Sequence, residues 1–264
     1  MIAQGERLLA GSSWGACLTT EQHEYVRSEM FERVFPAGAT VCEQGSPSAH
    51  WIGVAEGILK CESIDVTGRA TTLGAVPAGA WAGESWVLKD ELRPYAFVAL
   101  QESMVVFVPQ STFLWLLENN PAFSRFVIDQ LNERLAHYMA LVQITRMNDA
   151  TGRLAYSLSE LFNQELYPGM RSRVQMSQEE VGRLSGLARG NTNQALRELQ
   201  EAGLLRVRYG GIEVLDIDGL RAWPGAEARC LLPRRRAAEM SALLSLQDRE
   251  NPSSKCLVQN SLSA

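Results

Sequence analysis

Two short predicted helices joined by a tight turn, within residues 176–204, constrain this chain more than any other feature. Ser177 followed three residues later by Glu180 has the pattern of a capping box, so a helix should begin there. Gly186 lies in a three-residue turn, where the absence of a Cβ atom permits a positive φ. A second helix should begin at about Ala188, and Gly203 is placed to end it. This is helix-turn-helix geometry, in which the second helix enters the major groove of DNA.

The side chains on the exposed face of the second predicted helix are suited to reading bases. Arginine pairs with guanine, and asparagine or glutamine pairs with adenine. Two short strands around Gly210 and Gly211 would form a wing able to touch phosphate or sugar. The expected DNA-binding residues are Ser177, Gln178, Arg189, Gly190, Asn191, Asn193, Gln194, Arg197, Arg206 and Arg208. The motif alone also fits a helical corner whose polar residues only face water.

The charge distribution favours the DNA-binding interpretation. The whole chain has a net charge of −5, whereas residues 171–211 hold seven arginines and four glutamates, a local charge of +3. The remainder therefore carries −8. A basic region in an acidic protein is what phosphate contact by one small domain requires.

The region before this motif has a different pattern. From about Phe31 to Pro109, glycines recur at intervals of 4 to 12 residues between short strand-like runs such as 40–42, 51–54 and 95–100. Many short strands with glycine turns are typical of a β-roll or barrel. The predicted fold class is therefore α+β, with an N-terminal β-roll followed by helices and the winged helix-turn-helix.

A helix after Pro121 connects the two regions. Its apolar residues at 128, 131, 135, 138 and 142 follow steps of three and four, which is a heptad pattern about three heptads long. Polar neighbours, among them Asp129 and Arg134, favour a two-chain coiled coil over a core helix packed on the roll. Phe123, Phe126 and Val127 are instead expected to pack on the roll. We therefore expect a homodimer.

These patterns divide the 264 residues into four parts. Residues 1–120 should form the β-roll sensing domain with an N-terminal helical segment, and 121–148 the dimerisation helix. Residues 149–222 should form the winged helix-turn-helix domain. Residues 223–264 should be a partly disordered tail that contains a basic run at 234–236 and, within 237–246, one short helix.

The order of these elements resembles the Crp/Fnr superfamily of transcription regulators. The resemblance covers about residues 35–214. It rests on the turns at 35–41 and 43–48, on 79–85, which look like the family's phosphate-binding cassette, and on 149–155, which look like its hinge. The resemblance implies a dimer with one ligand-sensing roll and one winged helix per subunit. Arg189 matches a family arginine that contacts a base, whereas Gly190 and Gln194 depart from the cyclic-AMP receptor pattern and predict a different operator.

The resemblance also implies an effector site in the roll. The family's cyclic-nucleotide site uses Gly-Glu to hold the ribose, an Arg–Ser pair for the phosphate and small hydroxyl residues on the dimer helix. The candidate effector-binding residues are Gly83, Glu84, Ser85, Arg93, Tyr95, Tyr138 and Met139. Gly83 and Glu84 match, but Tyr95 replaces the serine, and Tyr138 and Met139 replace the hydroxyl residues. A buried phosphate needs paired donors, which disfavours a cyclic nucleotide. Cyclic AMP, another small effector and no obligatory ligand remain the alternatives.

Other cofactors and functions find less support. The five cysteines are scattered, with only Cys17 before the roll, so we expect no iron–sulfur cluster. His23, His50 and His137 fall in no haem-ligand pattern, and no cysteine has a histidine at zinc-ligand spacing, so we expect neither haem nor a metal site. No catalytic motif indicates an enzyme. Without a signal peptide or a 20-residue apolar run, we expect a cytoplasmic protein with no membrane contact. Double-stranded DNA and RNA polymerase are the expected partners. The alternative is a ligand-binding regulatory module that acts through protein contacts rather than DNA.

Overall fold

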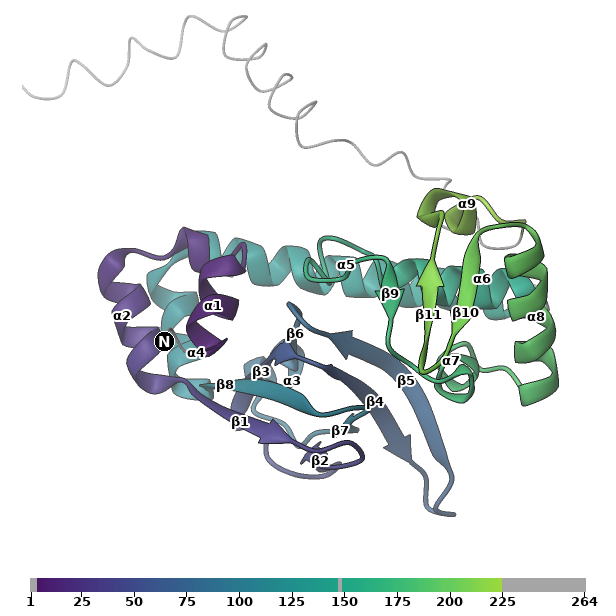
Figure 1. Ribbon diagram of the computed structural model, residues 1–264. Coiled ribbons are helices and arrows are strands. Elements are labelled where there is room, and N and C mark those ends of the chain that lie inside the picture. Colours follow the sequence, from purple (N-terminus) through teal and green to yellow (C-terminus); the bar gives the residue numbers. More distant parts are fainter. Residues whose placement is uncertain (1–3, 147–148, 225–264) are drawn as a thin grey trace, which may run out of the picture. The chain divides into compact units, whose positions relative to one another are not determined.

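The computed structural model describes residues 4–146 and 149–224 (Figure 1). It has the α+β architecture expected from the sequence, with a strand-rich N-terminal half, a long helix and a C-terminal helix-turn-helix region. Most of the predicted tail, including the basic run at 234–236 and the helix expected within 237–246, lies outside the described residues.

The β-roll consists of two four-stranded antiparallel sheets. One sheet has the strand order β1-β8-β3-β6, and the other β2-β7-β4-β5. Their bounds are β1 Phe31–Phe35, β2 Thr40–Cys42, β3 His50–Glu56, β4 Ile58–Ile64, β5 Ala70–Pro77, β6 Trp81–Ala82, β7 Ala96–Ala99 and β8 Ser103–Pro109. The strand-like runs found in the sequence are confirmed as β2, as part of β3 and, trimmed at both ends, as β7. Helix α3 (Glu84–Lys89) follows β6.

Gly57 shows why glycines punctuate this region. It joins β3 to β4 with a φ of 89°, which disfavours residues with a side chain. A Cβ atom at Gly57 would also lie 2.2 Å from the Ser103 Oγ. The turn therefore needs glycine both for its backbone conformation and for the close approach of β8.

An aromatic cluster joins the N-terminal helices to the roll. These helices are α1 (Gln4–Gly11), the short 3-10 helix η1 (Gly15–Cys17) and α2 (Thr20–Glu29). The Trp14 ring, before η1, lies 5.1 Å from Trp51 of β3, 5.0 Å from Trp81 of β6 and 5.5 Å from Phe123. Trp14 and Phe123 are fully buried. Burial of large aromatic rings contributes a few kcal/mol each, so the cluster stabilises this end of the roll.

Helix α4 (Gln110–Asn119) leads into the long helix α5 (Pro121–Arg146). Phe123 and Val127 are buried against the roll and Phe126 packs beside them, as the sequence indicated. The heptad residues divide differently: Leu131 is partly buried, while Ile128, Leu135 and Val142 are each more than half exposed. An unpaired apolar stripe on one helix is suited to a second helix.

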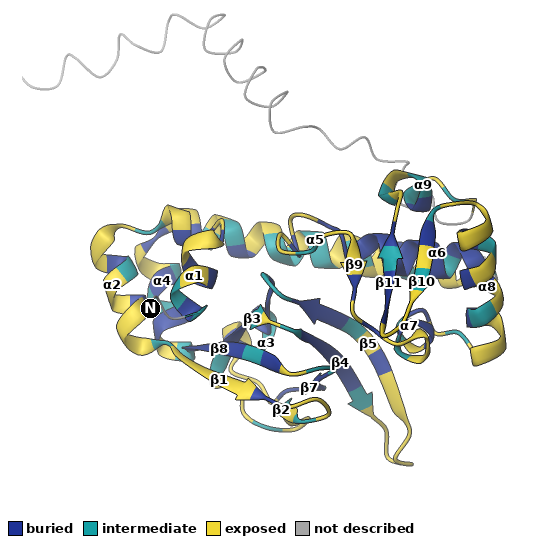
Figure 2. Ribbon diagram, in the orientation of Figure 1, coloured by how far each residue is buried: buried dark blue, intermediate teal, exposed yellow. Residues whose placement is uncertain are grey.

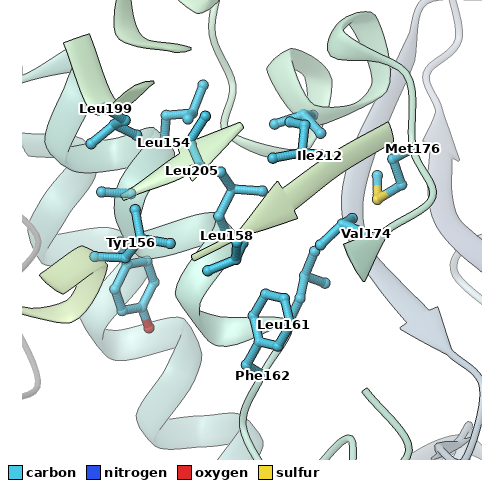
Figure 3. Packing of buried hydrophobic residues seen from close by; sticks show 14 of the residues in the cluster. Leu154, Tyr156, Leu158, Leu161, Phe162, Val174, Met176, Leu199, Leu205 and Ile212 are labelled. Atoms are coloured by element: carbon cyan, nitrogen blue, oxygen red, sulfur yellow. The ribbon is translucent and has the colours of Figure 1, made fainter. Parts of the chain in front are cut away.

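The buried core of the C-terminal module (Figure 3) also includes Ile58 and Ala75 of the roll and Ala140 and Ile144 of α5. Its elements are α6 Ala150–Glu160, β9 Arg173–Val174, α7 Gln178–Leu184, α8 Arg189–Glu201, β10 Leu205–Arg208, β11 Gly211–Val214 and α9 Ile217–Arg221. Leu154 and Leu158 of α6, Leu199 of α8 and Ile212 of β11 are all fully buried in one cluster. The sheet has the order β10-β11-β9, so the predicted hairpin is confirmed and gains a short third strand.

Candidate nucleic-acid interface and effector cavity

The first helix of the motif begins where the sequence predicted. The Ser177 hydroxyl accepts a hydrogen bond from the Glu180 amide at 3.1 Å, which caps α7. The expected capping box is formed only in part, by this hydrogen bond to the Glu180 amide. The Glu180 carboxylate is directed instead toward Arg183, at 3.7 Å, and Lys60, at 4.0 Å. Thr19 and Gln22 form a complete box at the start of α2.

The turn between the helices matches the prediction. Gly186 has a φ of 63°, in the left-handed region. The Arg153 guanidinium of α6 donates to the carbonyl oxygens of Ser185 and Gly186, both at 3.0 Å. A long cationic side chain therefore holds the turn by its backbone, a contact that sequence spacing does not show.

Helices α7 and α8 meet at a glycine. A Cβ atom on Gly182 would lie 2.5 Å from the Thr192 Oγ1, and Thr192 is 2% exposed. This pair sets how closely the two helices approach, and it was not predicted from the sequence. The one sequence feature that could have indicated the pair is Gly182 itself, a glycine four residues before Gly186 on the side that faces the second helix.

Helix α8 ends at a Schellman motif. Gly203 has a φ of 76°, the Leu204 amide donates to the Leu199 carbonyl at 3.0 Å, and the Gly203 amide donates to that of Gln200 at 3.0 Å. The predicted stop at Gly203 is confirmed. The apolar face is also as expected, with Ala195, Leu196 and Leu199 buried.

The opposite face of α8 is exposed (Figure 2). Arg189 is its first residue, and Gly190, Asn191, Gln194 and Arg197 are also exposed, while Asn193 is partly buried. A hollow of about 730 Å³ lies between the starts of α7 and α8 and the wing. Of the predicted DNA-binding residues, the hollow is lined by Ser177, Gln178, Arg189, Asn193 and Arg208. The other five lie outside it.

The wing carries both its predicted arginines and a carboxylate that binds them. Arg208 of β10 lies 3.2 Å from the Glu213 Oε2 of β11, and Arg206 lies 3.7 Å from the same atom. Tyr209, at the tip, is fully exposed and lines the hollow. One carboxylate thus offsets part of the positive charge of the wing.

A second cavity, of about 310 Å³, lies in the roll between β4, β5, β7, the start of α3 and α5. Gly83, Glu84, Ser85, Tyr95 and Tyr138 of the predicted effector residues line it. The other candidates do not. Aromatic residues form much of the wall, and the Trp86 Nε1 donates to the Tyr95 hydroxyl at 2.8 Å. Burial raises the pKa of both Tyr95 and Tyr138, so their hydroxyls stay neutral at physiological pH.

Arg134 is the charged centre of this cavity. Its Nε lies 2.5 Å from the Glu84 Oε1, and its Nη2 donates to the Trp81 carbonyl. Burial alone would lower the pKa of Arg134, but the Glu84 carboxylate raises it, so the guanidinium stays charged. The sequence indicated Arg134 only as one of the polar residues beside the heptad seam. Its side chain, 20% exposed, turns toward the roll because Glu84 offers a buried counter-charge.

Two predicted effector residues lie elsewhere. Met139 is 66% exposed. Arg93 is 3% exposed, and its Nη2 donates to the His50 carbonyl of β3 at 2.8 Å. The Arg93 Nη1 is close to Gly83 and has no hydrogen-bond partner within the described part of the chain. Neither side chain lines the cavity.

Comparisons with known proteins agree with this architecture. Residues 32–120 match the cyclic nucleotide-binding domain family, and residues 152–223 match the Crp-like helix-turn-helix domain family. A cyclic AMP receptor protein from Thermus thermophilus is 25% identical over 75% of this chain and 89% of its own length. The transcriptional activator protein anr of Pseudomonas aeruginosa is 24% identical over 74% and 81%. The FixK2 structure from Bradyrhizobium japonicum shares the fold, with a TM-score of 0.59, 17% identity and coverage of 73% and 96%.

A β-roll that encloses a cavity, followed by a long helix and a winged helix-turn-helix, defines a DNA-binding transcription regulator with a sensing domain. The chain belongs to the Crp/Fnr family of transcription regulators. This supports the DNA-binding interpretation and not the alternative of a module that acts only through protein contacts.

Within residues 4–146 and 149–224, no helix is both long and apolar enough to cross a bilayer. The same residues contain no group of three or more His, Cys, Asp or Glu side chains arranged to hold a metal ion.

Proposed function

We propose that this regulator works in the cytoplasm as a homodimer, reading a roughly palindromic operator through α8 under control of the roll, and that it acts by binding and not by catalysis. The single observation that carries the proposal is the exposed face of α8 beside the hollow formed with the wing. Arg189 stands at the start of that helix, and Arg208 faces it across the hollow. A recognition helix reads base edges with its N-terminal residues, while the wing binds the backbone.

The dimer is supported by the exposed face of α5. Leu135 is 60% exposed, Ile128 53% and Val142 52%, and they follow one heptad pattern. Apolar side chains at this spacing are stabilised by a facing helix. A second copy of the chain supplies an identical stripe, and twofold symmetry of the dimer corresponds to a palindromic site.

The base-reading residues support an operator unlike that of the cyclic-AMP receptor. Arg189 suits a guanine, but Gly190 has no side chain to read a base. The Gln194 Nε2 donates to the Glu198 Oε1 at 2.9 Å, which orients its amide. Glutamine in that orientation offers its oxygen to adenine.

The cavity of the roll supports an effector other than a cyclic nucleotide. Arg134 is the one cation among the described residues that line it, and Glu84 neutralises that charge. A cyclic phosphate there would lack a free counter-charge, which is costly in a buried site. We propose double-stranded DNA and RNA polymerase as the macromolecular partners, with no resident metal, iron–sulfur cluster or haem.

The test is selection of bound sequences from random double-stranded DNA by the full chain, with and without cyclic AMP. We expect one enriched palindromic motif, no dependence on cyclic AMP, and binding that weakens steeply with salt. Arg189→Ala should lose discrimination at one base pair per half-site, about 1–3 kcal/mol. Arg69→Ala, at the exposed tip of the β4–β5 hairpin, removes the same charge elsewhere and should keep the motif. An unchanged motif in Arg189→Ala would contradict the proposed reading.

A further inference from the structure

One wall of the effector cavity comes from the DNA-binding module. Tyr167 belongs to the loop between α6 and β9, yet it lines the cavity together with Glu84, Tyr138 and Arg134. It is 8% exposed, and its neighbour Leu166 is 2% exposed. Both pack into the hydrophobic core of the roll. Tyr167 was not predicted from the sequence, because it lies in a loop, where residue spacing does not indicate which side chains are buried.

The loop is held against both α5 and the roll. The Gln130 Nε2 of α5 donates to the Glu165 carbonyl at 2.6 Å. Gly79 and Gly169 pack backbone against backbone, since a Cβ atom on Gly169 would lie 2.3 Å from the Ala78 carbonyl oxygen. These contacts fix the backbone of the loop, so the position of Tyr167 follows from the loop conformation and not only from its side-chain rotamer.

The hydroxyl of Tyr167 takes part in the polar centre of the cavity. Burial raises its pKa, and the Arg134 guanidinium opposes this through charge and a hydrogen bond. Arg134 and Tyr167 thus lie in the wall of the same cavity, where Arg134 also pairs with Glu84. A buried phenol that shares the cavity with this ion pair takes up space that a ligand could occupy.

Glu84 leaves one buried atom unsatisfied. Glu84 is 4% exposed, and its Oε2 has no hydrogen-bond partner among the residues that the structure describes. An unpaired buried carboxylate oxygen costs free energy that a donor from a ligand would recover. The surrounding wall is apolar and aromatic, and the Glu84–Arg134 pair is neutral as a unit.

We propose that Tyr167 is a built-in occupant of the effector cavity, and that a small neutral ligand with an aromatic body and a hydrogen-bond donor for Glu84 displaces it. This rests on the proposed effector function of the roll. Displacement of Tyr167 moves the loop 161–172, which continues α6 into β9 and α7. The cavity is thereby coupled to the helix-turn-helix within one chain.

The test uses indole as the probe, because it is neutral, flat and carries one N–H donor. Binding to the full-length protein is measured by calorimetry, for the wild type and for Tyr167→Ala and Tyr167→Phe. Indole should bind Tyr167→Ala roughly tenfold tighter than the wild type, because it no longer competes with the ring. Tyr167→Phe keeps the ring and should stay near the wild type. Glu84→Gln in the Tyr167→Ala background should reverse the gain.

Gly169→Ala is the second variant, in case Tyr167→Ala does not fold. Its Cβ atom would push the loop, and Tyr167 with it, away from Ala78 while every side chain that lines the cavity keeps its identity, so it should also tighten indole binding. Hydrogen exchange at residues 161–170 should rise when indole binds the wild type. Equal indole affinity in the wild type and in both folded loop variants would overturn the proposal, as would tighter binding of cyclic AMP than of indole to Tyr167→Ala.

The two proposals fail separately. Loss of the enriched DNA motif in the wild type without any probe would remove the proposed function and leave the indole result standing. An enriched DNA motif together with equal indole affinity in the wild type and the loop variants would contradict only the proposal that Tyr167 occupies the effector cavity.

Discussion

The Thr151 hydroxyl at the start of α6 donates to the Glu198 Oε2 of α8 at 2.6 Å, which joins the hinge of the DNA-binding module to its reading helix. Gln194 binds the other oxygen of the same carboxylate. Both hydrogen bonds lower the pKa of Glu198, and the one from Thr151 has the larger effect.

Thr151→Val should therefore destabilise the module by about 1 kcal/mol at neutral pH. Because the folded-state pKa of Glu198 lies below its unfolded value of 4.5, the carboxylate stabilises the fold above pH 4.5 and loses this effect as the pH falls through the folded-state pKa. Urea unfolding of both proteins at pH 7 and pH 3.5 tests this. The difference in free energy of unfolding between the wild type and Thr151→Val should be smaller at pH 3.5 than at pH 7. An equal difference at both pH values would contradict a stabilising hydrogen bond from Thr151 to the Glu198 carboxylate.

Gly182→Ala should separate the two helices of the motif. The new methyl group would meet Thr192 at 2.5 Å, and overpacking of this kind destabilises by about 1–3 kcal/mol, more than the helix propensity of alanine restores. Thr192→Ala in the same chain should restore part of the loss. Gly190→Ala, which meets nothing within 4 Å, is the matched control and should be neutral or slightly stabilising in thermal unfolding.

Glu213→Gln should strengthen DNA binding without changing the preferred motif. The substitution removes the carboxylate shared by Arg206 and Arg208, so both guanidinium groups become available to phosphate. Affinity measured against salt should show a steeper slope, by about one phosphate contact. Glu118→Gln, at an exposed position of α4, removes an equal charge outside the wing and should leave the slope unchanged. Equal slopes in all three proteins would indicate that the wing does not touch DNA.

Leu135→Asp should dissociate the proposed homodimer. It places a charge in the middle of the apolar stripe of α5, where burial against a second helix is unfavourable. Sedimentation should show mainly monomer at micromolar concentration, with the helical content retained. Ala136→Asp adds the same charge one residue further along, at an exposed position outside the heptad pattern, and should remain dimeric.

The buried thiol of Cys61 should be inert to alkylation. Burial raises its pKa to about 12. At pH 8 about one thiol in ten thousand is then ionised, so iodoacetamide should label exposed Cys17 far faster in peptide mapping of the native protein. The unfolded thiol ionises near 9.0, so stability should fall as the pH rises from 9 toward 12. Cys61→Ala should reduce that alkaline loss.

The helix-turn-helix was predictable because its signals are local. A cap at Ser177, a turn at Gly186 and a stop at Gly203 each depend on residues within one or two helical turns. The exposed face of α8 follows from the same spacing, because Ala195, Leu196 and Leu199 must face the core. The β-roll was predictable from glycine spacing, as a class of fold but not in its strand order.

The effector cavity could be predicted only in part. Gly83 and Glu84 were found through a resemblance, whereas Tyr167 was not among the expected residues. The contact of Arg134 with Glu84 was not predicted, because a polar residue beside a heptad seam can face solvent or a buried counter-charge. Sequence spacing carries no information about the partner that decides between them.

The sequence by itself determined the order of the elements, the apolar faces of α5 and α8 and the ends of the helix-turn-helix, because these depend on neighbours along one chain segment. Only the tertiary structure decided which side chains meet. It placed Gly182 against Thr192, Glu213 between two arginines, and Tyr167 beside Arg134 in the roll. Such contacts join residues that are distant in sequence or on different elements. They are selected by packing and by compensation of buried charge, which act through space.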